Sequence, residues 1–190
     1  MSTSGAFLPD KNFETLLARS AAPVLLGKKP AALFAGPLPR CTGTAVPGGI
    51  RFLSLTRPGH NPLIFVFRPS LLERTLEAPQ ARRSLEEFGY PVSEGLQALL
   101  RCLGRRFQES REFPHEIGFF LGYPPHDVLG FIYYRGAGCK LCGPWKVYDD
   151  VERAAALFGE YAWCRQRLLE HLQGGGTIFD EELPVLLKAP

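Results

Sequence analysis

The chain lacks the catalytic and nucleotide-binding motifs that are easiest to recognise in a sequence. It has no G-x-S-x-G hydrolase turn, no H-E-x-x-H zinc-protease helix, no Walker loop and no dinucleotide-binding G-x-G-x-x-G. No segment reaches the roughly 18 to 20 consecutive apolar residues that a membrane-spanning helix needs. The sequence therefore supports none of the common hydrolase, zinc-protease or nucleotide-binding functions, and we expect no membrane association.

Regular cysteine spacing and strong net charge are also missing. Five cysteines, an odd number without a repeating pattern, do not make a disulfide framework. The opening MSTSGAFLPDKNF lacks the basic start and the apolar run of a signal peptide, so we expect a cytoplasmic protein with reduced thiols. The net charge of +3 does not indicate nucleic acid as a partner, because dedicated binders concentrate basic residues in a strong patch.

What is present is the composition of an ordinary globular domain. The 190 residues are 45% hydrophobic and 22% charged, which suits one folded domain with a sizeable core. We expect a flexible tail over residues 1–9, a single α+β domain over residues 10–173, and an accessory tail over residues 174–190 that begins with three glycines. In that domain a small mixed β-sheet of about four or five strands packs against several helices.

The clearest strands are Ile50–Thr56 and Leu63–Arg68, joined by the turn sequence RPGHN into an antiparallel hairpin near residues 50–68. The second contains LIFVF, which is apolar throughout and predicts a central strand covered on both faces. Further strands are expected at Ile117–Leu121 and Trp145–Tyr148. Residues 27–49, which precede the first of these strands, are rich in proline. Gly27-Lys28-Lys29, at their start, is expected to form a turn.

Helical signals fill most of the remaining chain. A helix from Asp10 is expected to end at Pro23. The triplet GYP occurs at 89–91 and again at 122–124, which indicates the same kind of turn at both places. A last helix, capped by Asp149 or Asp150, is expected to end at the glycine run after Gln173. The other expected helices are Leu71–Leu76, Pro79–Phe88, Ser93–Glu109 and one that begins at Pro124-Pro125.

Residues 113–148 hold the greatest density of groups that could carry chemistry, beginning with the C-x-x-C pair Cys139 and Cys142. Two thiols at this spacing can bind one metal ion or close a redox disulfide. A zinc or iron–sulfur centre normally needs four ligands, so Cys164 is a candidate third ligand and His115 or His126 a candidate fourth. The pair precedes a strand rather than a helix, unlike a thioredoxin-like motif, and the cysteines could also be incidental.

Two other sets of residues in this block are candidates for a site. His115 and Glu116 could act as a base and its orienting acid, or as ligands, although neighbours in a strand face opposite sides. The aromatic residues Tyr123, Trp145 and Tyr148 could line a pocket for a flat ligand. An ordinary aromatic core explains the same aromatic pattern, and both interpretations stay open.

The run HEIGFFLGYPPHDVLGFI, followed by CGPWKVY and a helix containing YAWC, resembles the clostridial family called domain of unknown function 3793. The segments KPAALF and LIFVFRPSLLE fit the same pattern, and the resemblance covers about residues 12–170. Pro125-His126 stands where the pattern has a leucine and an acid, so no role passes to His126. The resemblance implies an intracellular domain of an anaerobic bacterium and supplies no activity.

Three hypotheses follow for the function. The first is a binding protein whose site lies in the block 115–148 and holds a metal ion, an iron–sulfur centre at Cys139, Cys142 and Cys164, or a small ligand. The second is an enzyme that uses His115, Glu116 and a reactive cysteine on a small molecule. The third is a protein-interaction module without a cofactor.

Overall fold

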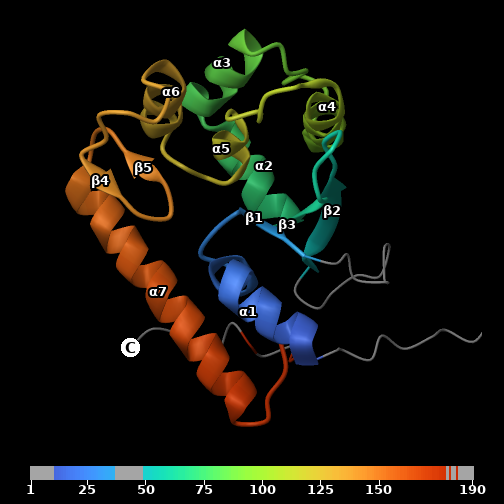
Figure 1. Ribbon diagram of the computed structural model, residues 1–190, viewed down its shortest axis with the longest axis vertical. Coiled ribbons are helices and arrows are strands. Elements are labelled where there is room, and N and C mark those ends of the chain that lie inside the picture. The colour runs from blue at the N-terminus through green and yellow to red at the C-terminus, as the bar shows by residue number, and fades with distance from the viewer. Residues whose placement is uncertain (1–10, 37–48, 179, 181–182, 184–190) are drawn as a thin grey trace, which may run out of the picture.

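The computed structural model describes residues 11–36, 49–178, 180 and 183 (Figure 1). Within these ranges, helices and small antiparallel sheets form an α+β fold, which confirms the predicted class. The expected tail over residues 1–9, the Asp10 cap and most of the proline-rich segment before the first hairpin lie outside the described residues.

Strand β3 (Leu63–Phe67) is the central strand of the larger sheet. It pairs antiparallel with β1 (Ala31–Ala35) along one edge and with β2 (Arg51–Leu55) along the other, in the order β1-β3-β2. The predicted hairpin and the predicted central position of LIFVF are therefore confirmed. β1 was not predicted, because the prolines around it indicated a loop.

The side chains of β3 alternate between two hydrophobic cores, one on each face of this sheet. Phe65 and Phe67 belong to the first core, whereas Ile64 and Val66 belong to the second. Successive side chains of a strand point to opposite faces, so an entirely apolar strand needs cover on both. Full burial of each such side chain contributes roughly 1.5–3 kcal/mol to the stability of the folded state, so this strand stabilises both cores.

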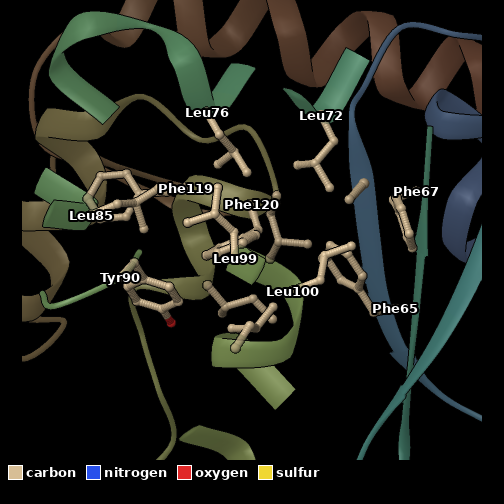
Figure 2. Close-up of a cluster of buried hydrophobic side chains, with 14 of the residues drawn as sticks. Phe65, Phe67, Leu72, Leu76, Leu85, Tyr90, Leu99, Leu100, Phe119 and Phe120 are labelled. Atoms are coloured by element: carbon tan, nitrogen blue, oxygen red, sulfur yellow. The ribbon is translucent and has the colours of Figure 1, made fainter. Parts of the chain in front are cut away.

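A group of helices covers the first face of the sheet. Figure 2 shows how their leucines and aromatic rings gather against Phe65 and Phe67. The predicted helices in this part of the chain are confirmed, with one addition that is described below. They are α2 (Pro69–Glu77), α3 (Pro79–Glu87), α4 (Leu96–Glu109), α5 (Ile117–Phe120) and α6 (Pro125–Tyr133).

Helix α5 corrects the prediction of a strand at Ile117–Leu121. The two GYP triplets explain the difference, because each ends a helix with a glycine at positive φ, +76° at Gly89 and +75° at Gly122. In each case the following tyrosine N–H donates to a carbonyl five residues earlier, Tyr90 to Leu85 and Tyr123 to Gly118. This is the hydrogen-bond pattern of a glycine-terminated helix. The apolar run IGFFL is thus the buried turn of a helix rather than a strand.

Helices α1 (Lys11–Leu25) and α7 (Val151–Gln173) lie together over the second face (Figure 1). Pro23 does not end α1 as predicted: it lies in the last turn, and the helix continues to Leu25. The missing N–H and the ring of a proline disturb the turn that precedes it, so the residues after it can stay helical. The predicted Asp150 cap of α7 is confirmed by a 2.9 Å hydrogen bond from the backbone N–H of Arg153. Among the described helices, none has both the length and the apolar character to cross a membrane.

A second, two-stranded sheet joins β4 (Leu141–Cys142) to β5 (Lys146–Val147). The strand predicted at Trp145–Tyr148 is therefore present in shorter form. This hairpin packs Trp145 and Val147 against α7 in a third small cluster. Both sheets are antiparallel, so the prediction of one mixed sheet is wrong. The short loops of the β2–β3 and β4–β5 hairpins permit only antiparallel pairing, and β1, which is not joined to β3 by a hairpin loop, is antiparallel to it as well.

The described residues after Gln173 fold back onto α1 and do not extend away from it. The buried carboxylate of Glu14 accepts hydrogen bonds from Thr177 Oγ1 at 2.7 Å and from the Ile178 N–H at 2.9 Å. Ile178 and Leu183 are buried in the second core. Part of the segment expected to be an accessory tail thus completes the fold.

We predict that Glu14→Ala destabilises the protein by about 1–3 kcal/mol, because it leaves the buried Ile178 N–H without its acceptor. Urea unfolding measures the loss, and Glu14→Gln, which keeps one acceptor oxygen, should lose less. Glu86→Ala, at an exposed carboxylate of α3, is the control. Equal stability of Glu14→Ala and Glu86→Ala would show that the C-terminal segment does not depend on this contact.

Candidate functional site

A pocket of about 250 Å³ opens between α5, α6, the β4–β5 hairpin and strand β1. Every residue that lines it lies between Phe113 and Lys146, apart from Leu33 of β1. The pocket therefore falls within the block in which the sequence indicated a site. Most of its surface is apolar. The apolar side chains that form this surface include Leu33, Ile117, Leu121, Val128, Phe131 and Trp145.

Asp127 fixes the shape of the pocket by joining α6 to the hairpin. Its carboxylate is 2% exposed and accepts two hydrogen bonds, from Trp145 Nε1 at 2.8 Å and from the Tyr148 N–H at 2.7 Å. Asp127 lies in the first turn of α6, the helix predicted to begin at Pro124-Pro125. Because both carboxylate oxygens are engaged, Asp127 positions the indole of Trp145 and is not available as a base in this arrangement.

Tyr123 and Trp145 form one side of the pocket as a stacked pair. Their ring centroids lie 5.0 Å apart with 26° between the planes, and the Tyr123 hydroxyl donates to the Pro144 carbonyl at 3.2 Å. Burial raises the pKa of Tyr123 to about 12, so this hydroxyl keeps its proton at neutral pH. Both residues were candidate pocket residues, and the structure places both in the lining.

His115 and Lys146 bring polar groups to the same pocket. The exposed His115 ring lies 4.8 Å from the Phe131 ring in an edge-on arrangement. The Lys146 amine donates to the Gly136 carbonyl and lies 6.0 Å from the centre of the Phe131 ring. The pocket thus combines aromatic surfaces with one imidazole and one ammonium group.

Glu116, the other half of the predicted His–Glu pair, faces away from the pocket. It is buried beside Arg106, whose Nη1 lies 3.2 Å away, and near the Tyr90 hydroxyl at 3.3 Å. Burial is the main cause of a raised pKa at Tyr90, and the Glu116 charge adds to it. The structure therefore does not bring His115 and Glu116 together, and Glu116 ties α5 to α4.

The cysteines divide into two places. Cys139 and Cys142 lie at the start of the hairpin with their sulfur atoms 3.1 Å apart, whereas Cys164 is buried in the second core. Burial is the main cause of the raised pKa of Cys164, about 11. Across the described ranges, no group of three or more His, Cys, Asp or Glu side chains could hold a metal ion. Cys164 therefore does not join the other two, and metal binding stays a prediction that nothing here tests.

Tyr148, the last predicted pocket residue, lies outside the lining. Its ring stacks on Tyr134 at 5.7 Å with 18° between the planes, on the far end of the hairpin strand. Its backbone N–H, not its ring, contributes to the site, because it donates a hydrogen bond to the Asp127 carboxylate. Trp145 and Tyr148 flank β5 on either side, and their rings stack on different partners, Tyr123 and Tyr134.

Sequence reasoning missed Lys29, the most unusual cation near the site. Its side chain is 7% exposed, and its amine lies over the Tyr123 ring at 4.8 Å and the Tyr161 ring at 5.6 Å. The turn predicted at residues 27–29 is present, but no local signal separates Lys29 from the exposed Lys28. The rings beside its amine, Tyr123 and Tyr161, come from distant parts of the chain.

We predict that Lys29→Met stabilises the protein at pH 7. Burial lowers the pKa of the Lys29 amine from its usual value near 10.5 to about 8. Below pH 8 the amine is charged in both the folded and unfolded states, and the folded state bears a penalty of roughly 3 kcal/mol. Between pH 8 and 10.5 the unfolded chain binds more protons, so stability rises with pH through that window.

Urea unfolding at pH 7 and pH 9.5 measures both effects of this variant. Lys29→Met should be more stable than the parent at pH 7 and should gain less on going to pH 9.5. Lys28→Met is the control, because Lys28 is an exposed neighbour that pairs with Glu160 at 2.9 Å. The prediction fails if the two variants have the same stability and the same pH dependence.

Comparison with known proteins gives a family but no activity. The family model described as protein of unknown function (DUF3793) matches residues 17–180. No curated protein and no solved structure matches the chain. The match spans α1 to the C-terminal segment and includes every residue that lines the pocket. The chain therefore belongs to the DUF3793 family, the family that the motifs of residues 113–148 indicated.

Proposed function

We propose that this protein binds a small ligand with a flat apolar body and an acidic group in the pocket lined by residues 113–146 and Leu33. The observation that carries the proposal is the lining itself, which is largely apolar and includes a small number of polar groups. Ligand pockets in proteins commonly have this composition. Its volume of about 250 Å³ suits a molecule of one or two rings.

The flat shape of the ligand is argued from the aromatic side chains of the pocket. The stacked rings of Tyr123 and Trp145 stand on one side, and Phe131 with His115 stands on another. Aromatic rings pack favourably against other rings in stacked or edge-on arrangements. A planar ring is therefore the ligand shape for which these side chains provide the most contact.

The acidic group is argued from Lys146. Its amine donates to the Gly136 carbonyl, and among the described residues no carboxylate lies within ion-pair distance of it. Asp127, the carboxylate of the lining, is committed to Trp145 and Tyr148. An anionic ligand would provide the negatively charged partner of the Lys146 ammonium, through a charge-assisted hydrogen bond.

Binding is favoured over catalysis because the lining does not assemble an acid–base pair. His115 has ring contacts with Phe113 and Phe131, while Glu116 is engaged with Arg106 elsewhere. General acid–base catalysis needs a group within hydrogen-bond reach of the proton it transfers, usually with a partner that orients it. The described lining residues supply a cation, an imidazole and ring surfaces, which suit recognition.

A protein-interaction role is a second candidate, and one observation favours it. Tyr133 and Tyr134, at the end of α6, are 80% and 55% exposed, and they are the large hydrophobic side chains that stand out on the described surface. Tyrosine is common in protein interfaces because it offers both an apolar ring and a hydroxyl. Replacing both by serine and testing self-association by sedimentation distinguishes this role from ligand binding.

We predict that the pocket binds 5-(dimethylamino)naphthalene-1-sulfonate, a fluorescent anion built on a flat two-ring naphthalene, and that Lys146→Met weakens this binding roughly tenfold or more. A charge-assisted hydrogen bond contributes about 1.5–3 kcal/mol, which corresponds to that change in affinity. Titration of dye fluorescence measures the effect, and quenching of Trp145 emission in a Trp163→Phe background is a second readout.

Two further variants make this test specific to the pocket. Lys140→Met removes an exposed lysine from the same hairpin without touching the lining, so it should bind the dye like the parent. Leu33→Trp should fill the pocket from β1 and abolish binding while the far-ultraviolet circular dichroism stays unchanged. Equal weakening by Lys140→Met and Lys146→Met would show that the dye responds to surface charge, and the proposal would be wrong.

A further inference from the structure

Cys139 and Cys142 form an accessible thiol pair whose position is set by the hairpin backbone. Cys142 belongs to β4 and pairs with Lys146, while the N–H of Lys140, next to Cys139, donates to the Val147 carbonyl at 2.8 Å. Gly138, with φ of +68°, turns the chain just before the pair. The two cysteines are therefore held near one another by the backbone of the turn and the strand.

The sulfur atoms already lie close to bonding distance. They are 3.1 Å apart, and a disulfide bond is about 2.05 Å long. Side-chain rotations that bring the two sulfur atoms about 1 Å closer together would allow the bond to form. Cys142 is exposed and Cys139 is partly exposed, whereas Cys102 and Cys164 are buried in separate cores. Among the described cysteines, this pair alone combines access to solvent with a neighbouring thiol.

We propose that Cys139 and Cys142 are a thiol–disulfide exchange site that reacts with low-molecular-weight disulfides. The site goes beyond the proposed ligand pocket and does not depend on it. In the first step the thiolate of either cysteine attacks one sulfur of the small disulfide, forms a mixed disulfide and releases the other half as a thiolate. In the second step the other cysteine, after losing its proton to that thiolate, attacks the protein sulfur of the mixed disulfide and displaces the second small thiolate.

The electrons and atoms of this exchange balance. Two protein thiols are oxidised to one disulfide, and one small disulfide is reduced to two small thiols, so no other oxidant is needed. The protons of the two protein thiols end on the two released thiols. The reverse reaction with the reduced small thiol restores the pair.

The two thiols share one short contact, so ionisation of one affects the other. The hydrogen bond with Cys139 is the main cause of the raised pKa of Cys142, and burial and the Cys139 charge add to that effect. Because the thiolate is the attacking species, either cysteine can start the exchange and its neighbour then resolves it. Cys142 lies in β4, and the pair lacks the helix N-terminus that activates thioredoxin-like motifs, so the expected exchange is slower than theirs.

Oxidised glutathione tests the site in the full chain. Cys41, which lies outside the described residues, is first replaced by serine, so that the four described thiols remain. The reduced protein is incubated with the disulfide, and acid then stops the exchange. The free thiols are alkylated in denaturant near neutral pH, and the product is mapped by peptide mass spectrometry. The expected product is a single intramolecular bond between Cys139 and Cys142, with Cys102 and Cys164 still alkylated.

Single-cysteine variants separate the two steps. Cys142→Ser should stop at the first step and accumulate a glutathione adduct on Cys139. Cys139→Ser should stop at the same step with the adduct on Cys142, because no second thiol remains within reach to resolve it. A global readout of folding, such as urea unfolding, should be the same for both variants, since neither thiol is buried in a core.

Three results would overturn the proposal. One is an intermolecular disulfide or two separate glutathione adducts in place of the intramolecular bond. Another is the absence of a glutathione adduct in both single-cysteine variants, which would show that neither thiol reacts with the small disulfide. The third is stoichiometric binding of added zinc alone that protects both thiols from oxidised glutathione, which would make the pair a metal site.

Discussion

The constraint on which the rest of the structure depends is the burial of β3 on both faces. A five-residue strand without a polar side chain is stable only if separate layers cover its two sides, and the chain provides them from different parts of its sequence. Helices α2 to α5 pack on one side, whereas α1 and α7 come from opposite ends of the chain to cover the other (Figure 1). The C-terminal residues then complete that second layer through Glu14.

The position of the pocket follows from the length of α7. This helix has 23 residues, and its second half, with Cys164 and Leu168, packs on α1 over the sheet. Its first half extends beyond the sheet and carries Ala154 and Tyr161, whose cover is the small β4–β5 hairpin. A hairpin with two residues per strand has little stability of its own, so its place depends on side-chain contacts. The Asp127 carboxylate supplies two of them, and the space left between hairpin, α5 and α6 is the pocket.

The sequence predicted this fold where local chemistry decides the conformation. The β2–β3 hairpin, the central strand and the cap at Asp150 all depend on residues close together in the chain. The error at Ile117–Leu121 arose because a short apolar run has no period that separates a strand from a buried helical turn. The GYP triplet at 122–124 held the missing information, since its twin at 89–91 follows a clear helix.

The candidate site was predictable as a region but not as a set of roles. Density of aromatic residues located the pocket, because Tyr123 and Trp145 fall in one block. The roles of Asp127, Lys146 and Lys29 depend on partners that only the folded chain brings near, such as Tyr161 for Lys29. Conversely, Cys164 is a cysteine like the two of the thiol pair but lies away from them, in the second core. A cysteine on an inward helix face packs as a small apolar residue.

One consequence of this arrangement is that both proposed activities use the same hairpin for different reasons. The strands β4 and β5 hold Cys142 on the solvent side and Trp145 against α7, because neighbouring side chains on a strand and its turn face different ways. The backbone that presents the thiols therefore also positions the indole and the Lys146 amine of the pocket. A hairpin fixed by a few contacts to α6 and α7 can place reactive groups at its surface without exposing either hydrophobic core. Chemistry is thus concentrated in the part of the fold that contributes least to the burial around β3.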